Sequence, residues 1–207
     1  MMFDVATDDE TFRFDARLHQ YIDIRTGEVL PSITQLLERA GEVNGDFFSE
    51  ESAERGTQVH RLTLDYDLGA LDVSDCVSKY RGWLLAWEEL TTVLQRPDWL
   101  HLEEPFVHPV LRFAGTPDRV GYIYKRLSVA EIKSGPYAYA KRRGQPGPHE
   151  LQTALQAILV AKRLHINPEM IARWGLYIDE KGHGKALEFP NHADIRRARE
   201  IIRKFCL

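Results

Sequence analysis

Three charged residues fall on two adjoining strand-like segments whose other residues are mainly apolar. In "SVAEIKSG", the alternation of a strand places Glu131 and Lys133 on one face and Ile132 on the other. Asp118 belongs to the preceding segment, "GTPDRVGYIY", which a tight turn joins to the first as an antiparallel pair. Such pairing would bring the Asp118 and Glu131 carboxylates close together. We therefore expect two acids and a lysine to share one polar cleft.

These residue types suit hydrolysis of a phosphodiester. Two adjacent carboxylates repel each other unless a cation lies between them. Hard divalent cations such as Mg²⁺ are bound by one or two carboxylates, with water and phosphate oxygens as further ligands. The Lys133 ammonium could orient or help to deprotonate the attacking water, or neutralise charge developing on the phosphate. Another interpretation stays open at this point: Glu131 and Lys133 could pair across an exposed strand face, with Asp118 in a turn after Pro117.

The periodicity of the apolar residues predicts the elements that would position this cluster. Residues 11–31 alternate as a small β-hairpin that ends at a proline, and residues 32–41 form a short helix. Ser32 and Gln35 would cap that helix reciprocally, and Gly41 would end it. Helices are expected over residues 46–68 and 74–94. Gly56 is unusual in the first of them, because glycine costs about 1 kcal/mol in a helix interior; it would mark a start, a kink or a close approach to the backbone.

The second half of the chain changes to a period of two residues. Three strands are expected within 100–110, 112–124 and 127–134, followed by a helix over 149–165. Residues 170–178 form a further strand, residues 179–185 a turn, and residues 192–205 a closing helix. The order of helix, three strands, helix and strand predicts an α/β fold. Its sheet should be mixed, because the last strand returns by a helical crossover.

Composition narrows the classes of protein. The chain has 207 residues, of which 43% are hydrophobic, and is expected to form one domain over 1–207. Within it, an N-terminal hairpin and helices would span about 11–95, and a catalytic core would span about 97–207. It contains no apolar run long enough for a membrane helix, and no basic and apolar leader, so we expect a cytoplasmic protein. The net charge of −4 means that nucleic acid would be met by a local basic patch or through bound cations.

Two further classes of site are disfavoured by the sequence. Cys76 and Cys206 lie far apart and lack the C-x-x-C spacing of zinc or iron–sulfur sites, so both are interpreted as reduced thiols. The pattern G-x-x-x-x-G-K-[ST] is also missing, which argues against an NTP-driven motor.

Four sequence boxes in order, one of them made of two segments, resemble those of one nuclease superfamily. "GTPDRVG" and "VAEIKSG" look like the G-x-x-D and E-x-K of the PD-(D/E)xK nucleases. "RGTQVH" resembles the G-x-x-x-H box of the RecB-like and phage exonuclease branch, and "LQTALQA" resembles the Q-x-x-x-Y box of that branch. "LPSITQLLERAG" is similar to the P-S-[VI]-T-x-[IL]-L segment of its phage members. The resemblance covers residues 30–178. It implies an αβββαβ core with a mixed central sheet flanked by helices, to which the N-terminal hairpin and helices are additions.

The resemblance implies roles for individual residues. Asp118 and Glu131 would hold a divalent metal ion, with the backbone carbonyl of Ile132 as a further ligand, and Lys133 would be the catalytic lysine. His60 would be an additional metal ligand. The expected cofactor is Mg²⁺ or Mn²⁺, because imidazole suits transition metals better than Mg²⁺.

Other polar residues are expected around this centre. By resemblance, Gln152 would hold the catalytic lysine or the substrate, whereas the sequence departs from the family at Gln156, where tyrosine is usual; we interpret Gln156 as part of a polar rim. Glu54, nearly two helical turns before the histidine, is a candidate second-metal ligand. Either Glu103 or Glu104 must face inward, and alternation along the strand does not decide which.

A loop after the E-x-K strand combines basic and aromatic residues. Such a loop can grip phosphates and stack a base, at about 1–3 kcal/mol per stacked base. Its residues are Tyr137, Tyr139, Lys141, Arg142 and Arg143. The basic residues of the closing helix are interpreted as an ordinary solvated face.

The sequence as a whole predicts a metal-dependent deoxyribonuclease. By resemblance it would be a phage-type exonuclease of recombination, repair or replication, acting on single- or double-stranded DNA with a free end in a bacterial host cytoplasm. It could form a homo-oligomer or act with a recombination or replication protein. Two alternatives remain: a catalytically silent module that binds DNA or protein, and a structure- or sequence-specific endonuclease. The complete set of Asp118, Glu131 and Lys133 disfavours the former, and His60 with Gln152 disfavours the latter.

Overall fold

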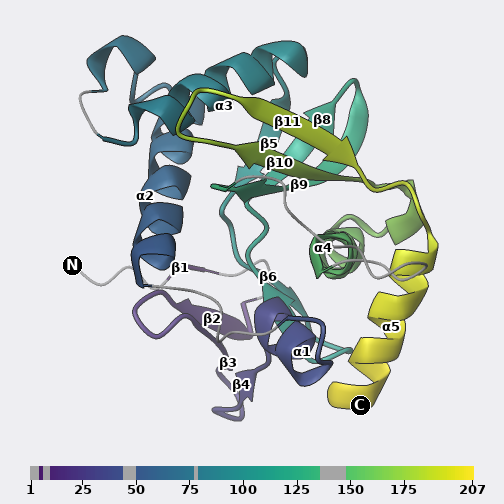
Figure 1. Ribbon diagram of the computed structural model, residues 1–207. Helices are drawn as coiled ribbons and strands as arrows, with labels where there is room; N and C mark the ends of the chain where they lie inside the picture. The colour runs from purple at the N-terminus through teal and green to yellow at the C-terminus, as the bar shows by residue number, and fades with distance from the viewer. Residues whose placement is uncertain (1–4, 7–9, 44–49, 77–78, 136–147) are drawn as a thin grey trace.

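A five-stranded mixed sheet forms the centre of the computed structural model, which describes residues 5–6, 10–43, 50–76, 79–135 and 148–207 (Figure 1). The strand order is β11-β10-β9-β8-β5. The strands are β5 (Asp98–Leu102), β8 (Arg119–Ile123), β9 (Arg126–Lys133), β10 (Ala172–Ile178) and β11 (Gly184–Glu188). Strands β9 and β10 are parallel, and the other neighbours are antiparallel. The helix α4 (Pro148–Leu164) makes the crossover from β9 to β10, as the sequence predicts.

Helices cover both faces of this sheet. Helix α4 packs against β9 and β10, with α5 (Ala193–Phe205) and α1 (Ile33–Arg39) beside it (Figure 1). Helices α2 (Glu50–Asp67) and α3 (Arg81–Val93) pack against the opposite face. No helix in the described part of the chain is both long and apolar enough to cross a membrane. The predicted order of helix, three sheet strands, helix and strand is therefore confirmed.

Strand β9 divides its side chains between these two layers. Ala130 and Ile132 belong to the cluster beneath α2 and α3, and Val129 belongs to the cluster beneath α4. Because side chains alternate along a strand, Glu131 and Lys133 continue the Val129 face, toward α4. The acid and the lysine thus enter the helix-covered side of the sheet rather than solvent.

The N-terminal region is larger than the predicted hairpin. It is a four-stranded antiparallel sheet of β1 (Val5–Ala6), β2 (Phe12–Asp15), β3 (Gln20–Asp23) and β4 (Val29–Leu30). Its apolar side chains pack on Val107 and Ala114. After Pro31 the chain enters α1, where Ser32 and Gln35 form the predicted capping box and Gly41, at a φ of 72°, follows the helix end.

Two long strands predicted before β9 are interrupted. Each breaks near a proline, Pro105 or Pro117, which cannot donate a ladder hydrogen bond. Between β5 and β8 the chain forms a separate two-stranded sheet of β6 (Phe106–His108) and β7 (Phe113–Gly115). The excursion connects the central sheet to the N-terminal sheet, since the Ala114 amide donates to the Pro31 carbonyl at 3.1 Å.

Two other boundaries differ from the sequence prediction. Helix α3 begins at Arg81 rather than near Ser74, because residues 73–75 form a separate 3₁₀ turn that Asp72 caps. Residues 184–188, expected partly as a turn, form the edge strand β11, whose side chains are exposed or half-buried. An edge strand of this kind carries little apolar alternation, which is why its sequence resembles a loop.

Candidate active site

Asp118 and Glu131 are buried beside each other at the ends of adjoining strands. Asp118 directly precedes β8, and its Oδ2 accepts a 2.7 Å hydrogen bond from the Ile132 amide of β9. Asp118 is 7% exposed and Glu131 5%. Because the N–H and C=O of one strand residue point to the same side, the Ile132 carbonyl also faces the side on which Asp118 lies. The structure thus brings together the two acids and the carbonyl singled out in the sequence.

Glu131 accepts hydrogen bonds from three side chains. Lys133 Nζ lies 2.9 Å and Gln152 Nε2 2.6 Å from Oε1, while Gln156 Nε2 lies 2.6 Å from Oε2. Lys133 Nζ also donates to Gln152 Oε1 at 3.1 Å. The two glutamines are one turn apart on α4, which runs across this face of the sheet. Gln156 therefore does not lie on a polar rim, as the sequence analysis proposed: it is 1% exposed and orients the acid.

His60, on α2, lies close to Asp118 and to a third acid, Glu103. Its Nδ1 lies 3.4 Å from Asp118 Oδ1 and 3.6 Å from Glu103 Oε1. Glu103 follows β5 with a φ of 50°, a left-handed conformation uncommon outside glycine. That backbone turn directs Glu103 to the site, whereas Glu104 bonds to His101 at 2.8 Å and to Arg163 at 3.4 Å. The structure therefore decides between the two glutamates in favour of Glu103.

A buried arginine holds α2 against β8. Arg119 is 0% exposed, and its Nε donates to Asp67 Oδ2 at 2.6 Å, its Nη2 to Thr63 Oγ1 at 3.2 Å, and its Nη1 to the Asp118 carbonyl at 2.7 Å. Its guanidinium also lies over the Trp87 ring, 5.5 Å from the centroid. No motif in the sequence predicts this network, which fixes the helix of His60 against the strand of Asp118. An arginine within a strand pattern carries no sequence signal that it is buried.

The cluster contains more negative than positive charge. Burial, and then the neighbouring Glu131 carboxylate, raise the pKa of Asp118 to about 7. Burial also acts to raise the pKa of Glu131, but Lys133 and Gln156 hold it below its usual value. Burial opposes the charging of His60, yet Asp118 and the nearby glutamates raise its pKa to about 9. When the adjoining Asp67–Arg119 pair is included, four acids meet three bases, an arrangement that a further cation would stabilise.

The chemical types of the donor atoms in this cluster suit a divalent metal ion. Asp118 Oδ1 and Glu103 Oε1 both approach His60 Nδ1, and carboxylate oxygen with imidazole nitrogen suits Mn²⁺ and related ions. Glu103 Oε1 is buried and accepts no hydrogen bond from any described residue. Within the described residues, no three His, Cys, Asp or Glu side chains are already spaced as the ligands of one ion. Hydrogen bonds from glutamine side chains to Glu131, and from a backbone amide to Asp118, already occupy part of the carboxylate oxygens.

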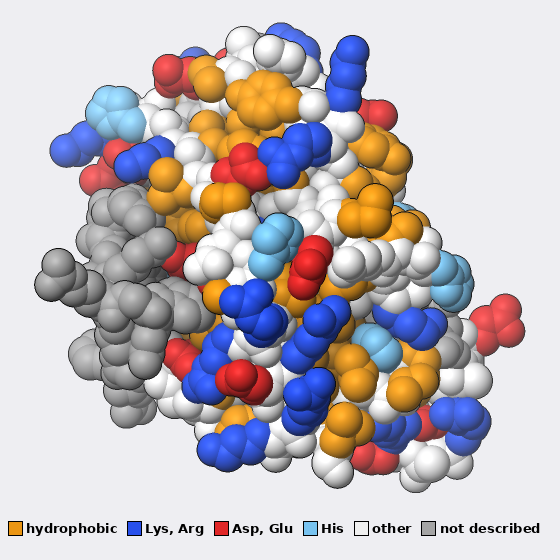
Figure 2. Space-filling model, turned by 90° about the vertical axis from the view of Figure 1, so that its right-hand side faces the viewer, with side chains coloured by type: hydrophobic (Ala, Val, Ile, Leu, Met, Phe, Trp, Pro, Cys, Tyr) orange, Lys and Arg blue, Asp and Glu red, His pale blue; other side chains and the backbone are white. Residues whose placement is uncertain are grey.

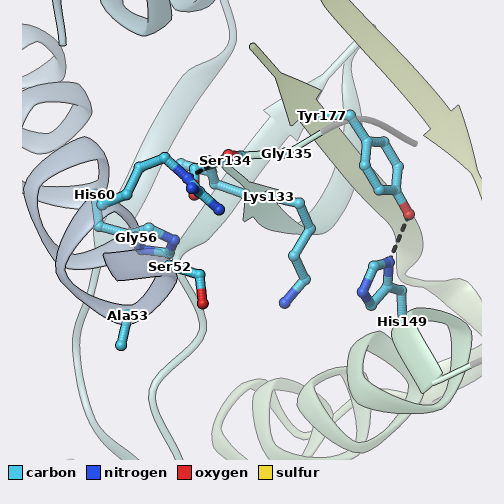
Figure 3. Close-up of a pocket in the computed structure, with 11 residues that line it drawn as sticks. Ser52, Ala53, Gly56, His60, Lys133, Ser134, Gly135, His149 and Tyr177 are labelled. Atoms are coloured by element: carbon cyan, nitrogen blue, oxygen red, sulfur yellow. Dashed lines mark hydrogen bonds between the residues drawn. The ribbon is translucent and has the colours of Figure 1, made fainter. Parts of the chain in front are cut away.

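Two hollows adjoin the cluster, and His60 lines both. The first, which we call the α2 hollow, has a volume of about 340 Å³ and lies between α2, the end of β9 and the start of α4 (Figure 3). It is lined by Ser52, Ala53, Arg55, Gly56, His60, Ile132, Lys133, Ser134, Gly135, His149 and Tyr177. The second, of about 200 Å³, lies toward the N-terminal sheet and includes Asp118, Glu103, Gln152 and Gln156.

Some residues singled out in the sequence are not brought to the site. Glu54 is exposed and lines neither hollow. Six residues of helix turn through about 600°, so Glu54 and His60 point to different sides of α2. Tyr137, Tyr139, Lys141, Arg142 and Arg143 lie outside the described residues.

The basic residues of α5 form an exposed face. Figure 2 shows the side of the molecule on which α5 lies, with Lys and Arg side chains gathered in its lower part. Arg196, Arg199, Arg203 and Lys204 are exposed there, and Arg197 is paired with Glu42 and Glu200.

Comparisons with known proteins yield structural likenesses only. No protein-family model matches the chain, and no curated protein matches its sequence. Among solved structures, an alkaline exonuclease from Laribacter hongkongensis is similar over 84% of this chain and 84% of its own, with 13% identity and a TM-score of 0.43. A structure described as SSO0001 covers 73% of this chain and 92% of its own, with 16% identity and a TM-score of 0.29. At these identities the likeness concerns the path of the chain alone.

Proposed function

We propose that the protein is a divalent-metal-dependent deoxyribonuclease that hydrolyses phosphodiester bonds, and that it acts from DNA ends as a RecB-like, phage-type exonuclease of the PD-(D/E)xK superfamily. One observation carries the proposal: Asp118 and Glu131 are buried side by side with Lys133 bonded to one of them. Buried acids that outnumber the bases lower the stability of the folded chain, and binding of a cation would explain why these acids are there. The four ordered motifs in the sequence support the same conclusion.

Asp118, Glu131, His60 and the Ile132 carbonyl would hold the metal ion, and Glu103 would be a further ligand. A bound Mg²⁺ or Mn²⁺ supplies Lewis acidity toward a phosphate oxygen and makes water a stronger nucleophile. Glu103 is included because its buried Oε1 lacks a hydrogen-bond donor among the described residues and faces His60. Burial opposes its ionisation, but His60 and Arg119 hold the pKa of Glu103 below its usual value, so the carboxylate stays charged and able to bind a cation.

Lys133 would act on the reacting groups directly. Its ammonium extends from β9 into the α2 hollow while bonded to Glu131 and Gln152 (Figure 3). From there it can orient the attacking water or neutralise charge that develops on the phosphate. Gln152 positions both partners, since its amide donates to Glu131 and its carbonyl oxygen accepts from Lys133. Gln156 fixes the other Glu131 oxygen, so the carboxylate is held in one orientation.

The test is degradation of end-labelled linear DNA and covalently closed circular DNA with Mg²⁺, Mn²⁺ or EDTA. We expect metal-dependent loss of the linear substrate alone, and no loss with Lys133→Ala or Asp118→Ala. Cleavage of the circle would indicate an endonuclease instead. Stable DNA binding without cleavage under every metal condition would overturn the enzymatic proposal in favour of a binding module.

Glu103 and Glu54 give a matched pair for the metal site. Glu103→Gln should weaken Mn²⁺ binding, measured by calorimetry without DNA, by about tenfold or more, because it removes a charged oxygen donor. Glu54→Gln makes the same chemical change on the exposed side of α2 and should leave the affinity within twofold. Equal affinities for the two variants would remove Glu103 from the ligand set.

A further inference from the structure

Gly56 is a glycine that packing against the described residues does not require. It lies within α2 and has no left-handed φ, and among the described residues a Cβ built on it would meet no atom closer than Ser134 Oγ at 4.0 Å. By contrast, a Cβ at Gly82 would lie 1.8 Å from the Glu180 carbonyl oxygen, and one at Gly121 would lie 2.2 Å from that of Asp98. Glycine disfavours a helix relative to alanine, so its presence at position 56 calls for a reason other than packing against the described residues.

The bare backbone at Gly56 forms part of the wall of the α2 hollow. The volume of about 340 Å³ lies at the lower end of the ~300–1,000 Å³ range of small-molecule sites. Figure 3 shows Lys133 extending into this space, with Ser52 and Gly56 on one side and His149 on the other. A side chain at position 56 would project into the same space.

The described lining of the α2 hollow favours an anion. It includes Arg55 and Lys133, and no Asp or Glu is among the described residues that line it. Arg55 Nε donates to the Ser134 carbonyl at 3.1 Å, a carbonyl that also accepts from Trp83 Nε1 at 3.3 Å. The guanidinium carries five N–H donors in a fixed fork, so anchoring through Nε leaves donors for a phosphate.

We propose that the α2 hollow is a nucleotide subsite for the strand being cut. The phosphate would lie on Arg55 and Lys133, and the sugar or base would lie against the helix backbone at Gly56. Lys133 belongs both to this hollow and to the acid cluster, so the nucleotide bound here adjoins the scissile phosphate. The inference deepens the proposed nuclease function and rests on it.

The deciding variant is Gly56→Ala, because it should not harm the fold. Alanine favours the helix, so the melting temperature should stay the same or rise. The affinity for a fluorescent single-stranded oligonucleotide, measured in EDTA, should fall about tenfold, because the methyl group takes the place on the helix backbone where the sugar or base would lie. Thr57→Ala is the matched control: it lies next on the same helix, is exposed and lines neither hollow, and its affinity should stay within twofold of the original.

Arg55→Met tests the phosphate contact by salt dependence. Loss of one phosphate contact should lower the slope of log affinity against log salt by about 0.7 for a single strand. Arg61→Met removes the same charge from an exposed position of α2 and should leave that slope unchanged. A nonspecific charge effect would instead lower this slope equally in both variants.

The outcomes separate this inference from the nuclease proposal. If the wild type cuts DNA, but Gly56→Ala and Arg55→Met bind and cut as it does, the subsite is wrong and the nuclease stands. If the wild type binds the oligonucleotide in a manner sensitive to both substitutions yet cuts nothing, the subsite stands and the nuclease is wrong. A wild type that binds no oligonucleotide overturns the subsite.

Discussion

Two clusters of charged side chains are buried on adjoining residues of the same strand region, and they are built differently. Around Arg119, the guanidinium pairs most closely with one acid, Asp67, and it also donates to Thr63 and to a backbone carbonyl. Around Asp118 the acids outnumber the bases, and the burial that both clusters share raises the pKa of that carboxyl to about 7. The first cluster joins α2 to β8, and the second faces the two hollows.

The difference separates a scaffold from a site. A buried ion pair with its hydrogen bonds satisfied holds elements in one arrangement, even where burial raises the pKa of its acid, as it does for Asp67. Excess buried charge does the opposite, because it lowers stability until a ligand neutralises it. Glu103 lies between the clusters, 3.5 Å from Arg119 and 3.6 Å from His60. The scaffold pair therefore also positions the site.

Breaking the scaffold pair should have the largest effect on stability. Asp67→Ala leaves Arg119 buried without its main partner, and such a change costs about 3–5 kcal/mol; the nearby Glu103 places the loss at the lower end. Urea titrations, which give the free energy of unfolding of wild type and variant, measure this loss. Asp65→Ala, at a partly exposed acid of the same helix paired to Arg61 at 3.9 Å, should change stability by less than about 0.5 kcal/mol. Similar losses for the two variants would contradict the scaffold role.

His149 should produce the next largest effect, through pH. Burial, and then the charge of Lys133, lower its pKa to about 4, so the unfolded chain binds a proton between pH 4 and 6.5 that the folded chain does not. Stability should therefore fall by up to roughly 3 kcal/mol as pH drops through that window. His149→Gln should remove this part of the fall. His108, whose pKa is also lowered to about 4, contributes in both proteins and cancels in the difference.

The buried acid of the site should respond in the opposite sense to that of the scaffold. At pH 8 in EDTA, Asp118→Asn should raise the free energy of unfolding by about 1–2 kcal/mol, because it removes a carboxylate that burial and the Glu131 charge disfavour. The amide oxygen can still accept from the Ile132 amide. The pKa of Asp67 is also raised by burial, but its removal leaves the Arg119 guanidinium unpaired. A loss of stability like that of Asp67→Ala would erase the distinction between the clusters.

An uncharged polar contact sets the scale for these effects. Ser32→Ala removes the side-chain cap of α1, which should cost about 1 kcal/mol. Thr34→Ala, inside the same helix and outside the capping box, is the control. If the cap proved as costly as the Asp67 substitution, buried charge would not be what distinguishes the scaffold pair.

The central sheet and part of the site could be predicted because both depend on alternation. The period of two along β9 separates Glu131 and Lys133 from Ile132, and α4 has the apolar pattern of a crossover helix. Glu103 could not be predicted in the same way, since it leaves the strand in a left-handed conformation and alternation no longer applies to it. Gln156 was misinterpreted because a polar side chain on an apolar helix face is usually a rim residue.

Other features depend on tertiary contacts that leave no periodic signal. The excursion of β6 and β7 is stabilised by packing against the N-terminal sheet, through Val107 and Ala114. The burial of Arg119 depends on its pairing with Asp67, which lies 52 residues earlier in the chain. No local pattern encodes a partner at that distance.

The most direct test of the excess-charge account is the unfolding stability of wild type and Asp118→Asn, in EDTA and in millimolar Mn²⁺ at pH 8. A ligand present at 100 times its dissociation constant stabilises the folded state by about 2.7 kcal/mol. We predict a crossover: the variant is the more stable protein in EDTA, and the wild type is the more stable in Mn²⁺. The same difference between the two proteins in both buffers would mean that these acids do not bind a metal ion.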